Sequence, residues 1–287
     1  MSIELNADTI RNPKALAAAI VKYRTDPRLP QALAAAILTY VASEVDTTSL
    51  TSLFYDIVDL TPGQTASVHI EDGHYAIVVD SNGKPVMMDV ADTEVTAQRI
   101  HIASHIKLLW ADLAQGFVRP IADQQTTLTQ YINDQQDRVA INALSESVPD
   151  ENIIQSPGGK VSELAFNQAV TIINEWDKEI GNIITRATRI NVDMKRWKLS
   201  EMLRDDLLRK GVVKTFNGAN VDRTSRCPSD EMLLTPVETV GTLFNIIPLD
   251  IRQDFSVPPK YLGLYAEKYI GVIVRKPKYL SKIKVTA

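Results

Sequence analysis

Cysteine is almost absent from this chain, which has 287 residues and only Cys227. A single thiol excludes an internal disulfide framework and fits a protein made in a reducing compartment. No long apolar run occurs, and the N-terminal MSIELNADTIRNPK has no apolar core like that of a signal peptide. We therefore expect cytoplasmic synthesis, no membrane span and no export.

Positive charge is not in excess, since 31 Lys and Arg face 35 Asp and Glu. A dedicated DNA-reading protein normally has a strong basic excess, so that class is disfavoured. One short cluster, MKRWK at 194–198, mixes basic residues with a tryptophan and could contact nucleic acid. The simpler interpretation is the start of a solvated helix with Trp197 in the core.

Sequence motifs of catalysis are also absent. The turn QSPGGK resembles a phosphate-binding loop, but that motif needs glycine where Ile154 stands and Ser or Thr where Val161 stands. No G-x-S-x-G motif occurs, and nothing in the sequence marks a histidine that would activate Cys227. The sequence predicts no enzyme activity and no cofactor. An enzyme with an unrecognised site is the alternative, and it would be a stable monomer with a deep pocket of titratable groups.

The histidines do not predict a metal site. His101 and His105 form an HxxxH pair in RIHIASHIKLLW, but this segment alternates polar and apolar residues as a half-buried strand does. Four residues of strand span about 13 Å, so the two side chains cannot share one ion. His69 and His74 are five residues apart, on opposite faces of a strand.

Several segments have helical patterns. Two alanine-rich stretches, KALAAAIVKY and QALAAAILTY, predict short N-terminal helices. From Pro120, apolar residues spaced near 3.6 predict a long, largely exposed helix of about six turns. A second long helix is predicted along Ala165, Ala169, Ile172, Ile173, Trp176, Ile180, Ile183 and Ile184. RINVDMKRWKLSEMLRDDLLRKG then predicts a short strand and another helix, and TVGTLFNIIPLDI and KYIGVIVRKP predict buried strands.

A hairpin is predicted in YAIVVDSNGKPVMMDV, because Asn82-Gly83 suits the positive φ angles of a type I′ turn. The register that follows gives this hairpin one wholly apolar face. We call the six residues of that face the ribbon: Tyr75, Ile77, Val79, Val86, Met88 and Val90. Burial of six such side chains is worth on the order of 10 kcal/mol, so the face needs a cover.

In order along the chain come an N-terminal helical arm, a long extended hairpin, a long exposed helix, a second α/β section and a C-terminal strand pair. This α+β order resembles the Hong Kong 97-like capsid proteins of tailed double-stranded DNA bacteriophages and their encapsulin relatives. HYAIVVDSNGKPVMMDV with RIHIASHIKLLW looks like that family's E-loop, and ADQQTTLTQYINDQQDRVAINAL like its spine helix. The implied division is an N-terminal arm at 1–50, a P-domain segment at 51–63, the E-loop at 64–112, the spine helix at 113–148, the A domain at 149–250 and a return to the P domain at 251–287.

The resemblance implies a non-enzymatic shell protein that self-assembles as hexamers and pentamers into an icosahedral virion capsid around double-stranded DNA. It implies assembly in the host cytoplasm, non-specific contact with packaged DNA, and scaffold, portal and decoration proteins as partners, with no membrane. It also implies that a neighbouring subunit covers the ribbon. The chain shows no long charged scaffolding segment, so we expect a separate scaffold protein or a processed chain. Lys84 lies at the predicted hairpin tip, but no acceptor for the family's lysine–asparagine crosslink aligns, and this chemistry is not carried over.

Two alternatives remain open at this point. An encapsulin-type compartment shell would share the fold and would enclose a cargo enzyme rather than DNA. The ribbon could also be covered within its own subunit, if the strand at 99–110 folds back on it as a three-stranded meander.

Overall fold

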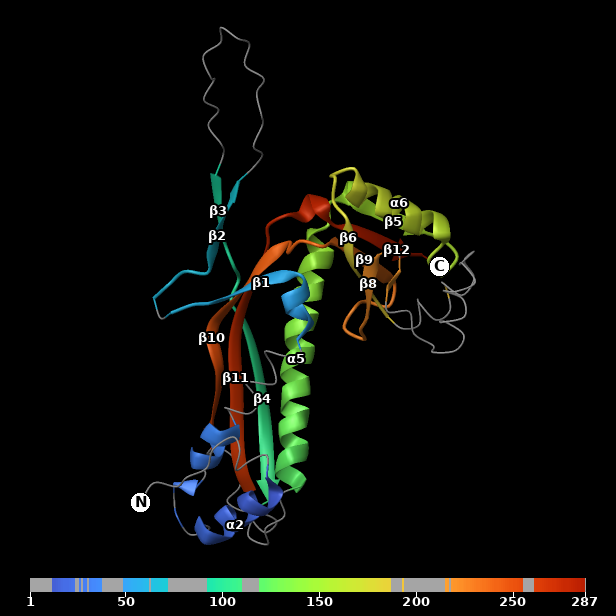
Figure 1. Cartoon of the computed structure of the whole chain (residues 1–287). Helices are drawn as coiled ribbons and strands as arrows, with labels where there is room; N and C mark the ends of the chain where they lie inside the picture. The colour runs from blue at the N-terminus through green and yellow to red at the C-terminus, as the bar shows by residue number, and fades with distance from the viewer. Residues whose placement is uncertain are drawn as a thin grey trace.

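The computed structural model describes residues 12–23, 26, 28–29, 31–37, 49–61, 63–71, 92–109, 119–186, 193, 215–216, 218–254 and 261–286. Two sheets and one long helix dominate the molecule (Figure 1). The four-stranded sheet has the longer strands, and together with helix α5 it forms an extended body. The six-stranded sheet lies beside one end of this body. The α+β class predicted from the sequence is confirmed.

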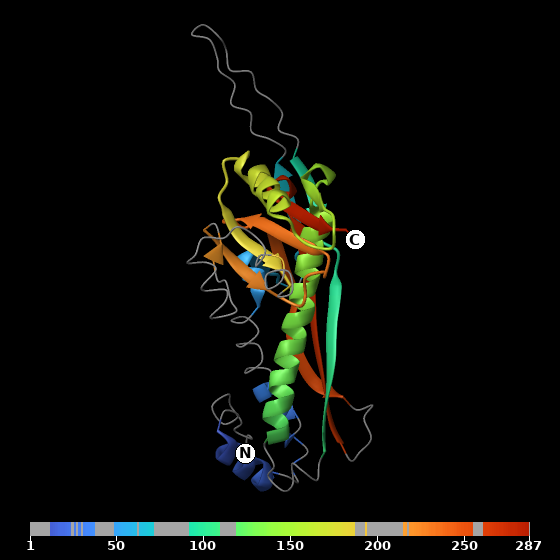
Figure 2. The same cartoon turned by 90° about the vertical axis from the view of Figure 1, so that its right-hand side faces the viewer.

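The four-stranded sheet has the order β1–β10–β11–β4. Its strands are β1 (Tyr55–Asp59), β10 (Gly241–Asp254), β11 (Tyr261–Val274) and β4 (Ile100–Leu109). Only the edge strand β1 runs parallel to its neighbour. Helix α5 (Arg119–Ser147) packs lengthwise against β4 and β11, as the two views show (Figures 1 and 2). The predicted long helix and the predicted strand at 99–110 are thus both present.

The six-stranded sheet has the order β5–β12–β9–β6–β8–β7. Helix α6 (Glu163–Asn174) packs against this sheet, and Ser162 caps its N-terminus by accepting a hydrogen bond from the Ala165 amide at 3.1 Å. The strands are β5 (Ile153–Ser156), β12 (Ser281–Val285), β9 (Glu231–Pro236), β6 (Ile180–Thr185), β8 (Ala219–Arg223) and β7 (Thr215–Phe216).

The remaining elements are short. Strands β2 (Ser67–Glu71) and β3 (Asp92–Thr96) pair with each other and with no other strand in the described ranges. The helix α2 (Pro13–Tyr23) and a helical segment at 31–37 confirm the predicted N-terminal helices. Single turns of 3-10 helix lie at η1 (Leu50–Leu53), η2 (Asp150–Asn152) and η5 (Pro277–Tyr279).

The predicted second long helix is wrong beyond Asn174, because α6 ends there and Ile180–Thr185 is strand β6. All six residues of β6 are buried, and the strand lies between β8 and β9. The spacing of its isoleucines fits the apolar face of a helix, and it fits a fully buried strand equally well. Gly181 is required here, since a Cβ atom would lie 2.5 Å from the carbonyl oxygen of Pro236. The strand and helix predicted at 189–211 lie outside the described residues apart from Asp193.

The predicted domain division remains a prediction, and the sheets show how the chain passes between its parts. After β9 the chain leaves the six-stranded sheet, since β10 and β11 are adjacent in the four-stranded sheet. It then returns, because β12 at Ser281–Val285 pairs with both β5 and β9. The chain thus crosses from the four-stranded sheet back to the six-stranded sheet between β11 and β12. The predicted division has its last boundary at residue 250, before β11, and includes no boundary at this later crossing.

One hydrophobic core spans both sheets. It includes Leu144 of α5, Ile270 of β11, Ile184 of β6 and the buried Cys227. A second core lies under α6, and a third joins the N-terminal helices to the far end of the long sheet. The two sheets therefore do not behave as independent units.

A polar network in the middle of α5, which we call the junction network, also ties the two sheets together. Asp137 is fully buried, and its carboxylate accepts hydrogen bonds from Ser49 Oγ at 2.7 Å and from the Leu50 amide at 3.1 Å. Arg226, between β8 and β9, forms ion pairs with Asp137 and Asp134. Gln136 accepts a 2.8 Å hydrogen bond from Lys268 of β11. One turn of α5 therefore holds η1, the long sheet and the loop of the other sheet.

A second polar contact fixes the C-terminal end of α5. Lys282 of β12 donates a 2.8 Å hydrogen bond to the Ser145 carbonyl oxygen, which lies in the last turn of the helix. A cation is favourable there because the helix dipole places negative partial charge on the last carbonyl groups. The Ser145 hydroxyl in turn donates to Glu231 of β9 at 2.5 Å.

The junction network predicts a pH-dependent loss of stability in Arg226→Met. Burial raises the pKa of Asp137, while the Ser49 hydrogen bond and the Arg226 charge lower it. Without Arg226 that pKa rises further, so the folded state holds a proton that the unfolded chain releases above about pH 4. The free energy of unfolding of the variant then falls as pH rises through this window. We expect the free energy of unfolding to fall by about 3 kcal/mol at pH 7, where Asp137 is buried without its cation. At pH 4.5 the loss should be smaller, because a protonated Asp137 carries no charge and keeps its contacts with Ser49 and Leu50.

Urea unfolding of the unassembled subunit at the two pH values measures this effect. Lys178→Gln, which removes an exposed ion pair with Glu238, serves as the control and should leave the unfolding free energy nearly unchanged. An equal loss at pH 4.5 and pH 7 for Arg226→Met would show that Arg226 acts by packing rather than by charge.

Candidate functional site

The base of the predicted hairpin is described, and its ribbon is not. The six ribbon residues, Tyr75, Ile77, Val79, Val86, Met88 and Val90, all lie outside the described residues. Below them β2 and β3 pair antiparallel, with Val68 opposite Val95. These two valines pack with Phe244 and Ile273 in a small core on the long sheet. One face of the base is thus anchored to the subunit that carries it.

Strand β1 is a second feature, because no strand of the described residues pairs with its outer edge. It forms one edge of the long sheet, and its last four residues are exposed. Ile57 and Val58, on opposite faces, are 44% and 39% exposed. An edge strand with free backbone groups and apolar side chains is a surface on which another chain can pair.

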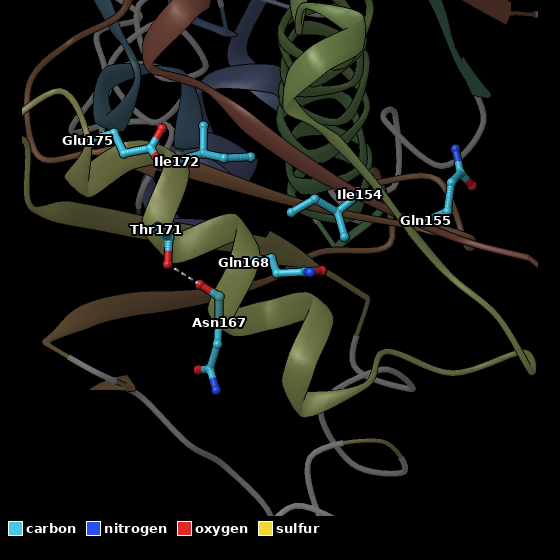
Figure 3. Close-up of a pocket in the computed structure, with 7 residues that line it drawn as sticks. All are labelled: Ile154, Gln155, Asn167, Gln168, Thr171, Ile172 and Glu175. Carbon is cyan, nitrogen blue, oxygen red and sulfur yellow. Dashed lines mark hydrogen bonds between the residues drawn. The ribbon is translucent and has the colours of Figure 1, made fainter.

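A third feature is an open groove beside α6, which we call the α6 groove (Figure 3). It consists of two adjoining cavities of about 580 and 380 Å³, which share Ile172 and Glu175. The first is lined by Ile154, Gln155, Asn167, Gln168, Thr171, Ile172 and Glu175, and the second by Glu151, Asn152, Ile172, Glu175 and Trp176. The groove runs along the edge strand β5 from η2 onwards, with α6 as its other wall.

The candidate reactive residues have structural roles. Cys227 is fully buried, and burial with the nearby Glu231 carboxylate raises the pKa of its thiol to about 12. A thiol of this kind stays protonated and is a poor nucleophile.

Within the part of the chain that the structure describes, no three His, Cys, Asp or Glu residues lie close enough together to hold a metal ion. The helices of that part include none that is long and apolar enough to span a bilayer.

The two histidines of the HxxxH pair lie on the exposed face of β4, as the alternation predicts. His101 stacks on Tyr269 with ring centroids 4.3 Å apart, and His105 meets Tyr265 edge to face at 4.9 Å. These are cross-strand pairs with β11, in the register His101–Tyr269 and His105–Tyr265. Each histidine therefore packs on a different tyrosine, and the pair does not converge on one point.

Sequence reasoning missed the junction network and the α6 groove. Arg226 lies 89 residues from Asp137, and Glu151 lies 24 residues from Glu175, so no local spacing marks either set. The one usable signal was polar residues on the inner face of a long amphipathic helix, such as Gln136 and Asp137, which need partners once buried.

Comparison with known proteins gives the fold. No family model matches the chain, and no curated protein matches it in sequence. Solved structures do match. The capsid of the cyanophage P-SCSP1u is 9% identical with a TM-score of 0.62, and the match covers 83% of this chain and 88% of that one. The mature capsid of bacteriophage PhiM1 is 12% identical with a TM-score of 0.60, covering 83% and 87%.

A compartment shell also matches. The holo-SrpI encapsulin from Synechococcus elongatus is 15% identical with a TM-score of 0.51, covering 82% of this chain and 86% of that one. The agreement thus extends over most of the chain at very low identity. The chain therefore has the Hong Kong 97-like fold that tailed-phage capsid proteins and encapsulin shells share.

Proposed function

We propose that this chain is the major capsid protein of a tailed bacteriophage, which self-assembles as hexamers and pentamers into an icosahedral head around double-stranded DNA. The observation that carries the proposal is the match of more than four fifths of the chain to subunits of phage capsids. The role is structural rather than catalytic, and the protein is located in the virion after assembly in the host cytoplasm. Scaffold, portal and decoration proteins are the expected partners, and contact with DNA is non-specific.

An encapsulin-type shell is the second candidate, because the Synechococcus encapsulin has the same fold. Its TM-score of 0.51 is lower than the 0.62 and 0.60 of the two phage capsids, so we favour the phage head. Capture of a peptide-tagged enzyme inside the shell would support the encapsulin instead.

The ribbon supplies the contact between subunits in this proposal. At the base of the hairpin the even-numbered Val68 and the odd-numbered Val95 face the subunit's own core. Successive strand residues face opposite ways, so with unbroken alternation Ile77 on the first strand and Met88 on the second fall on the other face. This alternation supports a ribbon that faces away from the core formed by Val68 and Val95. A neighbouring subunit is then its cover, and repetition of this head-to-tail contact closes a ring.

The expected product of expression is a particle. Purified full-length protein, alone or with a scaffold protein, should sediment as shells and appear hollow in negative-stain micrographs. A stable monomer at micromolar concentration, with no particles under either condition, would contradict the proposal and return the chain to the enzyme alternative.

The ribbon is tested by Ile77→Asp and Val79→Asp. A carboxylate on this face opposes burial between subunits, so we expect no particles. The unassembled subunit should keep its stability to within about 0.5 kcal/mol, because surface substitutions have small effects. Sedimentation measures assembly, and urea unfolding measures subunit stability.

Val78→Asp is the matched control, because it places the same charge on the opposite face of the same strand. Assembly should persist in this variant. A loss of several kcal/mol in the isolated Ile77→Asp subunit would show that the ribbon is covered within its own chain.

A further inference from the structure

The α6 groove has an open sheet edge along its floor. Strand β5 is the last strand of the six-stranded sheet and pairs only with β12, in parallel, over Ile153–Ser156. Alternate residues of a strand direct their amide and carbonyl groups to opposite edges, so β5 presents some of these groups outward. Within the described residues no strand occupies that outer edge. An extended polypeptide can therefore add to the sheet here.

The side chains along the groove suit an extended segment of particular chemistry. At the Ile154 end, Ile172 supplies a second apolar contact, with the polar Gln168 and Thr171 beside it on α6 (Figure 3). Glu175 lines both cavities, and in the second it lies with Glu151 and Trp176. The groove therefore offers apolar contacts at Ile154 and Ile172 and a pair of carboxylates beside Trp176.

Two carboxylates line the second cavity without an ion-pair partner among the described residues, although the Lys278 ammonium lies over its Trp176 wall. Neither Glu151 nor Glu175 takes part in an ion pair there, and both are exposed. Lys278 lies instead over the Trp176 ring, 5.1 Å from its centroid. Trp176 remains 46% exposed, which is unusual for so large an apolar side chain on a protein surface. Two carboxylates and an aromatic ring together favour the ammonium or guanidinium group and the apolar stem of a lysine or arginine.

We propose that the α6 groove is a docking site for an extended arm of a second, different protein, which adds a strand to β5 and places a lysine or arginine between Glu151 and Glu175. The negative charge of the groove favours a basic segment of another protein over the hairpin of a second copy of this chain. The two predicted strands of the hairpin, YAIVVD and VMMDVA, contain aspartates and no lysine or arginine. Lys84 precedes Pro85, which cannot donate a hydrogen bond to a sheet edge.

Peptide binding to the full-length protein tests the site, and it does not require that shells form. The probe is acetyl-Thr-Ile-Thr-Lys-Thr-Val-amide with a fluorescent label, in which the isoleucine and the lysine face the same side. Saturable binding by fluorescence anisotropy is expected. The same peptide with glutamate in place of lysine should bind at least about tenfold more weakly, because like charges oppose each other. A peptide with proline at its third position should also bind weakly, since it loses a strand hydrogen bond.

A second experiment reverses the charge of the groove on the protein. In Glu151→Lys/Glu175→Lys the preference should invert, so that the glutamate peptide binds more tightly than the lysine peptide. This gain of binding excludes simple misfolding as the cause. Glu94→Lys, on the remote strand β3, should leave the preference unchanged. Absence of saturable binding to the native protein, or equal binding of the two peptides, would overturn the proposal.

Discussion

The buried carboxylate of Asp137 is the point on which the described architecture depends. A single turn of α5 receives η1 through Ser49 and Leu50, and receives the loop between β8 and β9 through Arg226. A buried charge without a partner is costly, so the stability of this turn depends on all of these segments. The long helix is therefore a frame to which both sheets are fastened, and the core around Leu144 and Ile184 continues that connection in apolar side chains.

Several surfaces that this frame leaves exposed among the described residues are of a kind that pairs with other chains. Strand β1 ends the long sheet with Ile57 and Val58 exposed, and β5 ends the other sheet beside an acidic groove. The base of the hairpin is anchored by Val68 and Val95, and the predicted ribbon lies beyond it. The β1 edge and the hairpin differ from one another, and head-to-tail contacts between unlike surfaces of identical subunits form a ring when the rotation between subunits closes. That geometry is consistent with the proposed shell.

Strong local patterns were correctly interpreted from the sequence. The alternation of RIHIASHIKLLW predicted strand β4 and the exposed histidine face, and the 3.6-residue spacing from Pro120 predicted α5. The interpretation failed at Ile180, where a fully buried strand and a helix face share the same apolar residues. Only the positions of β8 and β9 on either side of β6 decide between them.

Residues close together in the chain are sufficient to give the α+β class, the order of the principal elements and the lack of recognisable catalytic motifs, because each of these features is local. The meeting of distant residues is a property of the fold: Arg226 pairs with Asp137, Lys282 binds the end of α5, and Glu151 and Glu175 line one cavity beside Trp176. Such contacts depend on how the chain crosses between two sheets. No spacing along the sequence encodes those crossings, since the partners are brought together by sheet order and by burial of a common core.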